Sequence, residues 1–366
     1  MTTMESEFRV LHLIDSLATG GAERVAVNLA NALSQKGLKV FLCTTRDEGP
    51  LTEELYKEVD YLFLRKKFRF DPVAIRTLIN FIQSNKIQLI HAHGSSILLA
   101  VIVKVLNKNV KVIWHDHYGA FSLKDRSSFT YQLLVSQTAG VIAVNKDLVT
   151  WATKKLRIPH NKVWLLSNFV HSKPFHSVSY LPGQKGYRLI CVANFRPQKD
   201  HINLIKAFEI VQMMEPEVHL LLVGIANDSE VKTSIYDQID RSGVKKSVTW
   251  LGSRNDVLDI MASCDVGILS SLSEGLPLVL LEYGSVGLPV VATDTGECSQ
   301  LLDHGNCGII VPPGNPTDLA EGILKYIRNP DYRAKMGMRF QTRIYNHYNQ
   351  DSIINQLIKI YKKILG

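Results

Sequence analysis

The chain has 366 residues, more than one hydrophobic core usually supports, so two domains are expected. A hydrophobic content of 46% with 21% charged residues excludes an intrinsically disordered chain, and a formal net charge of +8 allows nucleic acid, an anionic membrane or phosphorylated substrates as partners. The five cysteines have no C-x-x-C spacing, which indicates a reducing compartment and no metal site. The chain start is polar and acidic and the most apolar stretch is short, so neither a secretory signal nor a membrane span is expected.

Apolar runs typical of buried strands alternate with helical stretches in the first half. The first repeat is a strand over 10–14, a turn at Gly20 and Gly21 and a helix over 22–35. Further strands are expected at 38–44, 61–64, 87–91, 110–114, 141–144 and 163–166, and helices at 72–84, 95–106, 127–136 and 146–156. The polar stretch 171–185 contains Pro174, Pro182 and Gly183 and suits an interdomain linker.

The same alternation restarts after the linker. Strands are expected at 189–192, 220–223, 248–251, 266–269, 290–292 and 309–311, each followed by a helical segment. The stretch 332–366 is helical and basic and carries an apolar stripe, which consists of Ile353, Leu357, Ile360 and Ile364. Strands that alternate with helices indicate doubly wound parallel sheets, so the predicted fold class is α/β with two Rossmann-like halves.

The chemistry is expected where the strands end, because ligands of such sheets bind outside the carboxyl ends of the strands. The segment 270–282 follows the strand at 266–269, turns, and starts a helix with Pro277 at its first position. Backbone N–H groups at that helix start form an anion site, and phosphate is its natural ligand. Glu274 and Glu282 are separated by seven residues, a spacing that one capping and one solvated carboxylate would explain equally well.

Glu274 and Glu282, which frame Gly-Leu-Pro-Leu-Val-Leu-Leu, resemble the E-x7-E motif of the retaining glycosyltransferases of family 4. The resemblance spans nearly the whole chain and implies the GT-B fold, two Rossmann-like domains facing a central cleft. It implies an acceptor domain over 1–172, a nucleotide-sugar domain over 173–345 and a final helix over 346–366 that returns to the first domain. By this resemblance, Glu274 lies at the donor sugar as a catalytic residue, and Glu282 binds the ribose. The donor-binding residues between them are Gly275, Leu276, Pro277 and Leu278.

Two further turns resemble donor-binding segments of the family. Gly20 and Gly21 match its Gly-Gly loop, although a plain tight turn would use the same residues. Lys199 matches its phosphate-binding Lys, and we expect it to stabilise the leaving diphosphate as a catalytic residue. Asn194 stands where the family usually has an Arg, so Arg196 is expected to take that role, the alternative being a surface Arg.

The turn after the strand at 248–251 resembles the segment in which the family holds the nucleotide base. It adds three donor-binding residues, which are Gly252, Ser253 and Arg254. The predicted donor is a nucleotide diphosphate sugar, with a UDP-sugar favoured over a GDP-sugar. No D-x-D occurs in the sequence, so the diphosphate-bridging metal of other glycosyltransferases lacks its ligands, and neither a metal nor another cofactor is predicted.

Histidines are dense after two strands of the first half, at 91–93 and 115–117, a pattern that would also suit a metal site. The family carries a His-Asp after the strand that matches 110–114, beside the acceptor and the donor sugar. The resemblance therefore implies that His115 is catalytic and that Asp116 orients it. The expected acceptor-binding residues are His93, His115, Asp116 and His117. His201 follows Lys199 and is expected on the surface.

The segment 64–70 interleaves cations with aromatic residues. As a solvated loop it would have no function; as a binding surface it would attract anionic lipid through four cations and insert Phe68 and Phe70 at the interface. The four cations are Arg65, Lys66, Lys67 and Arg69. Single-stranded nucleic acid could use the same composition, but nothing else in the chain favours it. We therefore predict a cytoplasmic protein, peripheral on the inner membrane face, with a lipid-linked or glycan acceptor.

The resulting prediction is a retaining, metal-independent hexosyltransferase of cell-surface polysaccharide synthesis, such as capsule or lipopolysaccharide assembly. It would move a hexosyl or N-acetylhexosaminyl unit from the donor to the acceptor. Two alternatives stay open. A sugar-nucleotide 2-epimerase of the same architecture would yield epimerised sugar from donor alone. A non-catalytic nucleotide-sugar-binding partner would bind the donor without releasing nucleoside diphosphate.

Overall fold

The computed structural model describes residues 8–117, 127–169, 176, 178, 180–226 and 228–366. The chain divides into two compact units, which are described separately below. The first consists of residues up to Phe169 together with Gln350–Gly366, and the second of Val170–Asn349. The predicted linker 171–185 lies partly outside the described residues. No helix within the described ranges combines the length and the apolar composition that a membrane crossing needs.

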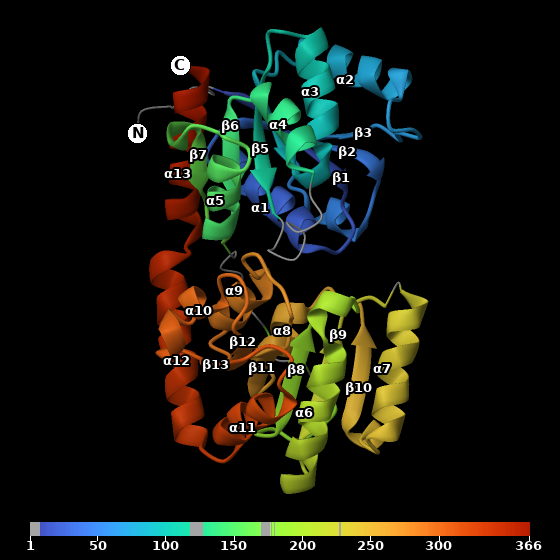
Figure 1. Ribbon diagram of the computed structural model, residues 1–366, viewed down its shortest axis with the longest axis vertical. Helices are drawn as coiled ribbons and strands as arrows, with labels where there is room; N and C mark the ends of the chain where they lie inside the picture. Colours follow the sequence, from blue (N-terminus) through green and yellow to red (C-terminus); the bar gives the residue numbers. More distant parts are fainter. Residues whose placement is uncertain (1–7, 118–126, 170–175, 177, 179, 227) are drawn as a thin grey trace. The chain divides into compact units, whose positions relative to one another are not determined.

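The first unit contains a parallel sheet of seven strands in the order β3-β2-β1-β4-β5-β6-β7 (Figure 1). Its strands are β1 (Arg9–Ser16), β2 (Lys39–Asp47), β3 (Asp60–Phe63), β4 (Leu89–His93), β5 (Lys111–Asp116), β6 (Gly140–Ala143) and β7 (Val163–Leu165). Its helices are α1 (Gly21–Gln35), α2 (Pro72–Ser84), α3 (Ile97–Leu106), α4 (Ser128–Ser136), α5 (Lys146–Lys154) and α13 (Gln350–Leu365). The central strands are buried on both faces, as expected for a parallel sheet.

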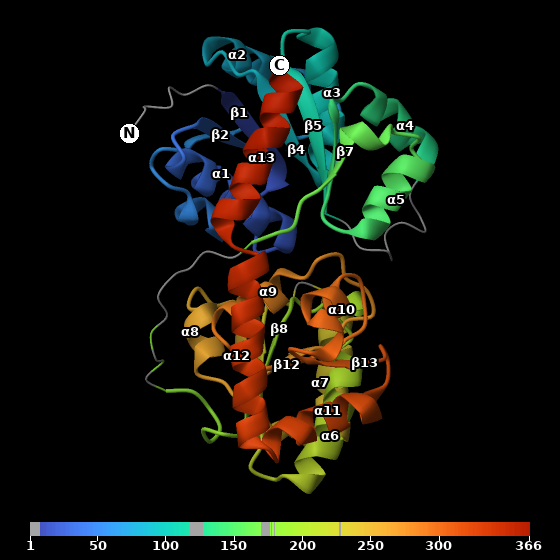
Figure 2. The same cartoon turned by 90° about the vertical axis from the view of Figure 1, so that its left-hand side faces the viewer.

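The two faces of this sheet differ in what covers them. On one face Leu11, Leu13 and Ile90 pack with residues of α2 and α3 in one apolar cluster. Because side chains alternate along a strand, His12 and His91 point to the opposite face. That face meets α13, since His91 contacts Tyr361, and α13 also packs against α1 (Figure 2). The predicted apolar stripe of α13 is buried, namely Ile353, Leu357, Ile360 and Ile364.

The second unit contains a parallel sheet of six strands in the order β10-β9-β8-β11-β12-β13. Its strands are β8 (Arg188–Val192), β9 (His219–Val223), β10 (Val248–Gly252), β11 (Val266–Leu269), β12 (Val290–Thr293) and β13 (Ile309–Val311). Its helices are α6 (His201–Met214), α7 (Ser229–Arg241), α8 (Val257–Ala262), α9 (Leu278–Ser285), α10 (Cys298–Leu301), α11 (Pro316–Ile327) and α12 (Pro330–His347). Apolar side chains of α6 and α11 pack on one face of the sheet in a single core cluster.

The stretch predicted to be helical over 332–366 forms two helices. The first, α12, begins at Pro330, whose missing N–H costs nothing at a helix start, and it ends before Tyr348. Tyr348 has φ −126° and ψ 27°, values that do not continue a helix, and α13 begins two residues later at Gln350. The border between the two units falls at the same point, so the final helix starts later than the predicted residue 346.

Candidate active site

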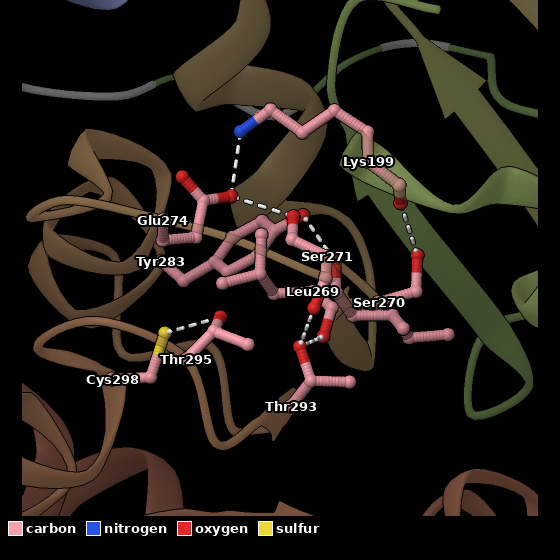
Figure 3. A network of polar contacts seen from close by, with 10 residues as sticks. Lys199, Leu269, Ser270, Ser271, Glu274, Tyr283, Thr293, Thr295 and Cys298 are labelled. Carbon is pink, nitrogen blue, oxygen red and sulfur yellow. Dashed lines mark hydrogen bonds and ion pairs between the residues drawn. The ribbon is translucent and has the colours of Figure 1, made fainter. Parts of the chain in front are cut away.

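The carboxyl edge of the second sheet brings together two charged residues that are 75 positions apart. Lys199 Nζ donates to Glu274 Oε1 over 2.6 Å, and the Ser271 hydroxyl donates to the same oxygen over 2.6 Å (Figure 3). The Ser270 hydroxyl donates to the Lys199 carbonyl over 2.9 Å. The side chains are 22% and 9% exposed, so this is a largely desolvated ion pair in which each charge depends on the other.

Hydrogen bonds from neighbouring segments hold the turn that carries Glu274. The Thr293 hydroxyl, at the end of β12, donates to the Ser271 carbonyl over 2.6 Å (Figure 3). The Glu297 N–H donates to the Gly275 carbonyl over 3.0 Å. Gly296 has φ +55°, and a Cβ atom there would lie 2.5 Å from the Glu274 carbonyl oxygen. Only glycine fits this position, because the neighbouring atoms are backbone and cannot turn aside.

The helix start after Glu274 differs slightly from the prediction. Pro277 is the residue before α9, with φ −71° and ψ 115°, and Leu278 is the first helical residue. The extended ψ of Pro277 lets the chain enter the helix from the turn. Leu276 and Pro277 are buried, whereas Gly275, Leu278 and Glu282 are half-buried. The first N–H groups of α9 thus follow directly on the Glu274 turn, and Glu282 lies one turn further along.

The polar side chains of the loop after β8 differ in their surroundings. Asn194 Oδ1 accepts from the Ile225 N–H over 3.0 Å and so ties this loop to the end of β9. Arg196 is exposed, and its guanidinium makes no ion pair with any residue that the structure describes. Asp200 takes the left-handed conformation, φ 47°, and accepts from the Asn203 N–H at the start of α6. Asn194 therefore acts as a tether, while Arg196 and Lys199 are the cations of this loop.

His201 was predicted to lie on the surface, but it is buried, with only 2% of its surface exposed. It is the first residue of α6, and its ring lies 4.6 Å from the ring of Phe195. Burial lowers the pKa of His201 to about 4, so the side chain is neutral. The prediction failed because the polar sequence around Lys199 indicates a solvated turn, whereas the helix that follows turns this side chain into the core.

The turn predicted to hold the nucleotide base ends β10. Gly252 has φ +70°, and its carbonyl accepts from the Gly224 N–H over 2.9 Å. Ser253 and Arg254 are exposed, and the Arg254 guanidinium pairs with Asp256 over 2.7 Å. The charge of Arg254 is thereby neutralised locally, so backbone groups of Gly252 and Ser253 are the better candidates for contacts with a base.

In the first unit, the predicted glycine loop leads into α1. Gly20 precedes the helix, and a Cβ atom there would lie 2.2 Å from Glu23 Oε2. A Cβ on Gly21 would meet nothing within 4 Å. Gly20 therefore allows the close approach of Glu23, while Gly21 leaves open space beside the backbone at the helix start.

Five histidines form a layer on the α13 side of the first sheet. His91 pairs with His12 of the neighbouring strand β1, and His93 pairs with His115 of β5. Four of the five are 0–2% exposed, and His117 is half-buried. The predicted histidines therefore do not all follow their strands: His91 and His93 belong to β4, and His115 belongs to β5. His12 was missed because a single His inside an apolar run carries no motif.

The imidazoles are joined in two hydrogen-bonded chains. His12 Nδ1 contacts His93 Nε2 at 3.0 Å, and His93 Nδ1 contacts His117 Nε2 at 2.9 Å. In the other chain His115 Nδ1 contacts His91 Nε2 at 3.0 Å, and His91 Nδ1 contacts the hydroxyl of Tyr361 at 2.5 Å. Burial lowers the pKa of His12 to about 3 and holds the pKa of the other buried members well below 6.5, so the layer is uncharged near neutral pH.

Neutral imidazoles are the form that binds metal ions. Ring nitrogens lie within 4.8 Å of one another in two groups, His12 with His91 and His93, and His93 with His115 and His117. Both groups could hold an ion. Four hydrogen bonds occupy most of the ring nitrogens, whereas the Nε2 atoms of His12 and His115 have no partner among the described residues. The predicted absence of a metal stays a prediction.

The predicted role of Asp116 in orienting His115 stays a prediction. Asp116 is buried, but as the next residue along β5 it points to the opposite face of the sheet. The Nδ1 atom of His115 is occupied by His91, and its Nε2 atom has no hydrogen-bond partner among the described residues. His115 also lines a narrow pocket together with Asn28 and Leu29 of α1 and with Asn168 and Phe169.

A further carboxylate at this edge was not predicted. Asp15, near the end of β1, accepts from the Thr45 hydroxyl over 2.5 Å and from the Ser95 hydroxyl over 2.6 Å. Asp15 directly follows an apolar strand run, and this position could have indicated a site residue at the end of the strand. Two donors from neighbouring chain segments fix this carboxylate at the carboxyl edge of the sheet, where its remaining lone pairs can accept further hydrogen bonds.

The predicted basic-aromatic segment lies beside β3. Phe68 and Phe70 are 68% and 63% exposed. Arg69 lies 5.8 Å from the centre of the Phe70 ring, and the Lys66 N–H donates to the Thr45 carbonyl over 2.7 Å. Arg65 and Lys67 are exposed as well. The segment thus presents aromatic rings and cations together at the surface, and its contact with a membrane stays a prediction.

Two family models cover most of the chain. The model described as Glycosyltransferase Family 4 matches residues 19–173, and the one described as Glycosyl transferases group 1 matches residues 172–343. The chain therefore belongs to the family 4 glycosyltransferases, and its two parallel-sheet units are those of the GT-B fold. The predicted family and fold class are confirmed.

Several known proteins are similar over nearly their full length. N-acetyl-alpha-D-glucosaminyl L-malate synthase of Bacillus anthracis is 22% identical, over 95% of this chain and 95% of its own. UDP-Gal:alpha-D-GlcNAc-diphosphoundecaprenol alpha-1,3-galactosyltransferase of Escherichia coli is 22% identical, over 99% of this chain and 98% of its own. Among solved structures, HepE of Anabaena in complex with UDP and glucose has a TM-score of 0.84 and 20% identity, over 97% of this chain and 100% of that chain. At this identity the likeness supports the fold.

Proposed function

We propose that the protein is a retaining, metal-independent hexosyltransferase. It moves a hexosyl or N-acetylhexosaminyl unit from a nucleotide diphosphate sugar, with UDP as the nucleotide, to a glycan or lipid-linked sugar in cell-surface polysaccharide synthesis. The observation that carries the proposal is the ion pair of Lys199 with Glu274, 2.6 Å long, at the carboxyl edge of the second sheet. The likeness to HepE, whose structure holds UDP and glucose, supports the choice of UDP.

Lys199 supplies the charge that the leaving diphosphate needs. When the donor binds, the Nζ atom turns from Glu274 towards the diphosphate, and the exposed Arg196 together with the first N–H groups of α9 adds to the positive field. Negative charge that develops as the glycosidic bond breaks is then met by groups already in place. A divalent ion does not have to bridge the phosphates.

The carboxylates of the same segment hold the two sugars of the donor. Glu274, kept in position by the Ser271 hydroxyl at 2.6 Å, accepts hydrogen bonds from hydroxyls of the hexose. Glu282, one turn into α9, accepts from the ribose hydroxyls. The base lies against the backbone of Gly252 and Ser253. Each of these roles uses a hydrogen-bond acceptor or donor near the carboxyl edge of the second sheet.

Transfer with retention needs no covalent link to the protein. The bond between the hexose C1 and the diphosphate oxygen breaks, and the acceptor hydroxyl forms its bond to C1 from the same face. Its proton passes to the departing phosphate oxygen, so charge and atoms balance without a protein base. The first unit binds the acceptor in this scheme, with His115 at the reaction centre and the half-buried His117 as an acceptor contact. His93 is 2% exposed and its two ring nitrogens contact His12 and His117, so it holds these rings in place rather than contacting the acceptor as predicted.

A lipid-linked acceptor is the proposal for the second substrate. The Escherichia coli relative is named for an acceptor that carries diphosphoundecaprenol. The segment 65–70 exposes Phe68 and Phe70 beside four cations, a composition that binds anionic membrane surfaces. The protein would then work at the inner face of the cytoplasmic membrane.

The membrane proposal is tested by co-sedimentation with vesicles of increasing anionic lipid content. Binding is expected to rise with that content and to fall strongly in a Phe68→Ser/Phe70→Ser double variant. Phe129→Ser is the control, because Phe129 is equally exposed, at 68%, but lies outside the basic segment. Binding that ignores the anionic lipid, or that the control loses equally, would refute the proposal.

The enzymatic proposal is tested in two stages. Thermal unfolding with UDP-, GDP- and ADP-sugars identifies the donor, and UDP-sugars are expected to give the largest shift. Release of nucleoside diphosphate is then measured with lipid-linked sugar acceptors, and the anomeric configuration of the product by NMR. Epimerised sugar from donor alone would favour an epimerase, and no shift with any nucleotide sugar would overturn the assignment.

A further inference from the structure

We propose that His115 acts as a neutral hydrogen-bond donor through Nε2–H, and that the buried pair of His91 with Tyr361 holds it in this tautomer. The tautomer follows from the contacts of the first unit alone. That the acceptor of this hydrogen bond is an oxygen atom of the sugar substrates rests on the proposed function. The last helix of the chain, α13, would thus control the chemistry of a residue on β5.

The first step is the direction of the hydrogen bond between Tyr361 and His91. Tyr361 is fully buried, and its hydroxyl contacts His91 Nδ1 at 2.5 Å. Burial raises the pKa of Tyr361 well above 10, so the hydroxyl keeps its proton. No other acceptor for that proton is found among the described residues. Either direction leaves one buried donor of this chain unpaired: the Tyr361 O–H in the core if the hydroxyl accepts, or the His115 Nε2–H beside a pocket if it donates. Only the second donor is placed where a bound ligand could accept from it.

The second step carries this direction to His115. A neutral imidazole has one N–H group and one lone pair. If His91 Nδ1 accepts from Tyr361, the proton of His91 is on Nε2 and is donated to His115 Nδ1 over 3.0 Å. His115 then carries its own proton on Nε2. Both rings are uncharged near neutral pH because burial holds the pKa of each well below 6.5.

The third step concerns the last donor of these hydrogen bonds, the Nε2–H group of His115. His115 is 1% exposed, yet Nε2 has no hydrogen-bond partner among the residues that the structure describes. The unpaired proton therefore lies near the carboxyl end of β5, beside the narrow pocket that His115 lines with Asn28 and Phe169. A buried N–H without an acceptor is costly, and an oxygen atom of a bound ligand would satisfy it.

This tautomer limits what His115 can do. A nitrogen that carries a proton cannot accept one, so His115 is not the base that deprotonates the acceptor. The same proton keeps Nε2 from binding a metal ion, since a metal ligand needs the lone pair. A donor at this place instead orients a sugar or phosphate oxygen, which agrees with transfer of the acceptor proton to the leaving phosphate.

Nitrogen NMR of the histidine-labelled protein tests the tautomer directly, because ring nitrogens with and without a proton differ widely in chemical shift. The signals are assigned with His91→Gln and His115→Asn variants. Both His91 and His115 are expected as Nε2–H tautomers, and in Tyr361→Phe the Nδ1 signal of His91 is expected to move as its hydrogen bond is lost. Tyr326→Phe is the control, since the buried Tyr326 hydroxyl has no hydrogen-bond partner among the described residues. A proton on Nδ1 of either ring would overturn the proposal.

Kinetics test the donor role independently. His115→Gln keeps an amide N–H near the position of Nε2, whereas His115→Asn places it near Nδ1. Turnover by His115→Gln is expected within about tenfold of the wild type, and His115→Asn is expected to lose about 10²-fold, the effect of removing one well-placed donor. Equal losses would overturn the donor role. If the wild-type protein transfers no sugar at all, the proposed function fails, and the nitrogen spectra still decide the tautomer.

Discussion

The carboxyl edges of the two sheets are built from different kinds of polar group. The edge of the second sheet carries an ion pair, Lys199 with Glu274, and supporting hydroxyls. The edge of the first sheet carries uncharged imidazoles that are bonded to one another, together with the Asp15 carboxylate, which two hydroxyls hold in place. A charged diphosphate needs fixed opposite charge, whereas a sugar hydroxyl needs a directed but neutral donor. This difference is consistent with the proposed function, in which the second unit binds the donor phosphates and the first unit binds uncharged hydroxyls.

Lowering the pH is expected to destabilise the first unit more than the second, and this is the largest predicted difference between them. Four fully buried histidines of the first unit stay neutral because burial depresses their pKa, that of His12 to about 3. Below pH 6.5 the unfolded chain takes up protons that the folded unit refuses, so stability is present above about pH 6.5 and is lost as the pH falls. Each group costs about 1.4 kcal/mol between about pH 7.5 and 5.5, and the four together about 5–6 kcal/mol.

Thermal unfolding at several pH values, followed by tryptophan fluorescence, checks this effect. Three of the four tryptophans, Trp114, Trp151 and Trp164, belong to the first unit, so the signal reports mainly on it. In the second unit the one His that is comparably buried among the described residues is His201, and a smaller loss is expected there. His160→Gln, which changes an exposed His, is the control. An unchanged midpoint down to pH 5.5 would contradict the neutral histidine layer.

Removing the ammonium group tests the charged edge. Lys199→Ala is expected to lower turnover about 10²- to 10³-fold, because the leaving diphosphate loses a fixed cation. Lys206→Ala in the same region is the control, since Lys206 is exposed on α6. The measurement is the rate of nucleoside diphosphate release at saturating donor. Unaltered kinetics in Lys199→Ala would show that the pair with Glu274 is only structural.

A substitution at Gly296, in the turn that contacts Glu274, is expected to lower the free energy of unfolding. Gly296→Ala places a Cβ atom 2.4 Å from the Gly275 carbonyl oxygen at φ +55°, so the turn must shift. The expected cost is about 1–3 kcal/mol of unfolding free energy, with weaker donor binding because Glu274 moves. Gly243→Ala is the control, since its φ is also positive, +71°, but a Cβ there meets nothing within 4 Å. Equal losses in both variants would show that φ, not the Glu274 turn, sets the cost.

The sequence predicts most of the fold and the charged edge, for physical reasons that particular residues show. Apolar runs such as 266–269 that alternate with helices are typical of parallel strands buried on both faces, and the strand ends of such sheets share one edge. Lys199 and Glu274 follow two strand ends, so their meeting was predictable. The histidine layer was not: His12 and Tyr361 stand alone in apolar patterns, and only the pairing of β1 with β4 and the packing of α13 bring them to His91.

The errors have a common cause as well. Side-chain direction decides whether His201 is solvated, and it depends on how a helix packs rather than on neighbours in the sequence. The break before Gln350 likewise follows the border between the two units.

The measurement that tests the central claim most directly is nucleoside diphosphate release by the wild-type protein in excess chelator, followed by addition of Mn²⁺. Because Lys199, Arg196 and the α9 N-terminus neutralise the diphosphate in this account, the rate is expected to stay within about twofold throughout. Loss of turnover with chelator and its return with Mn²⁺ would contradict the account.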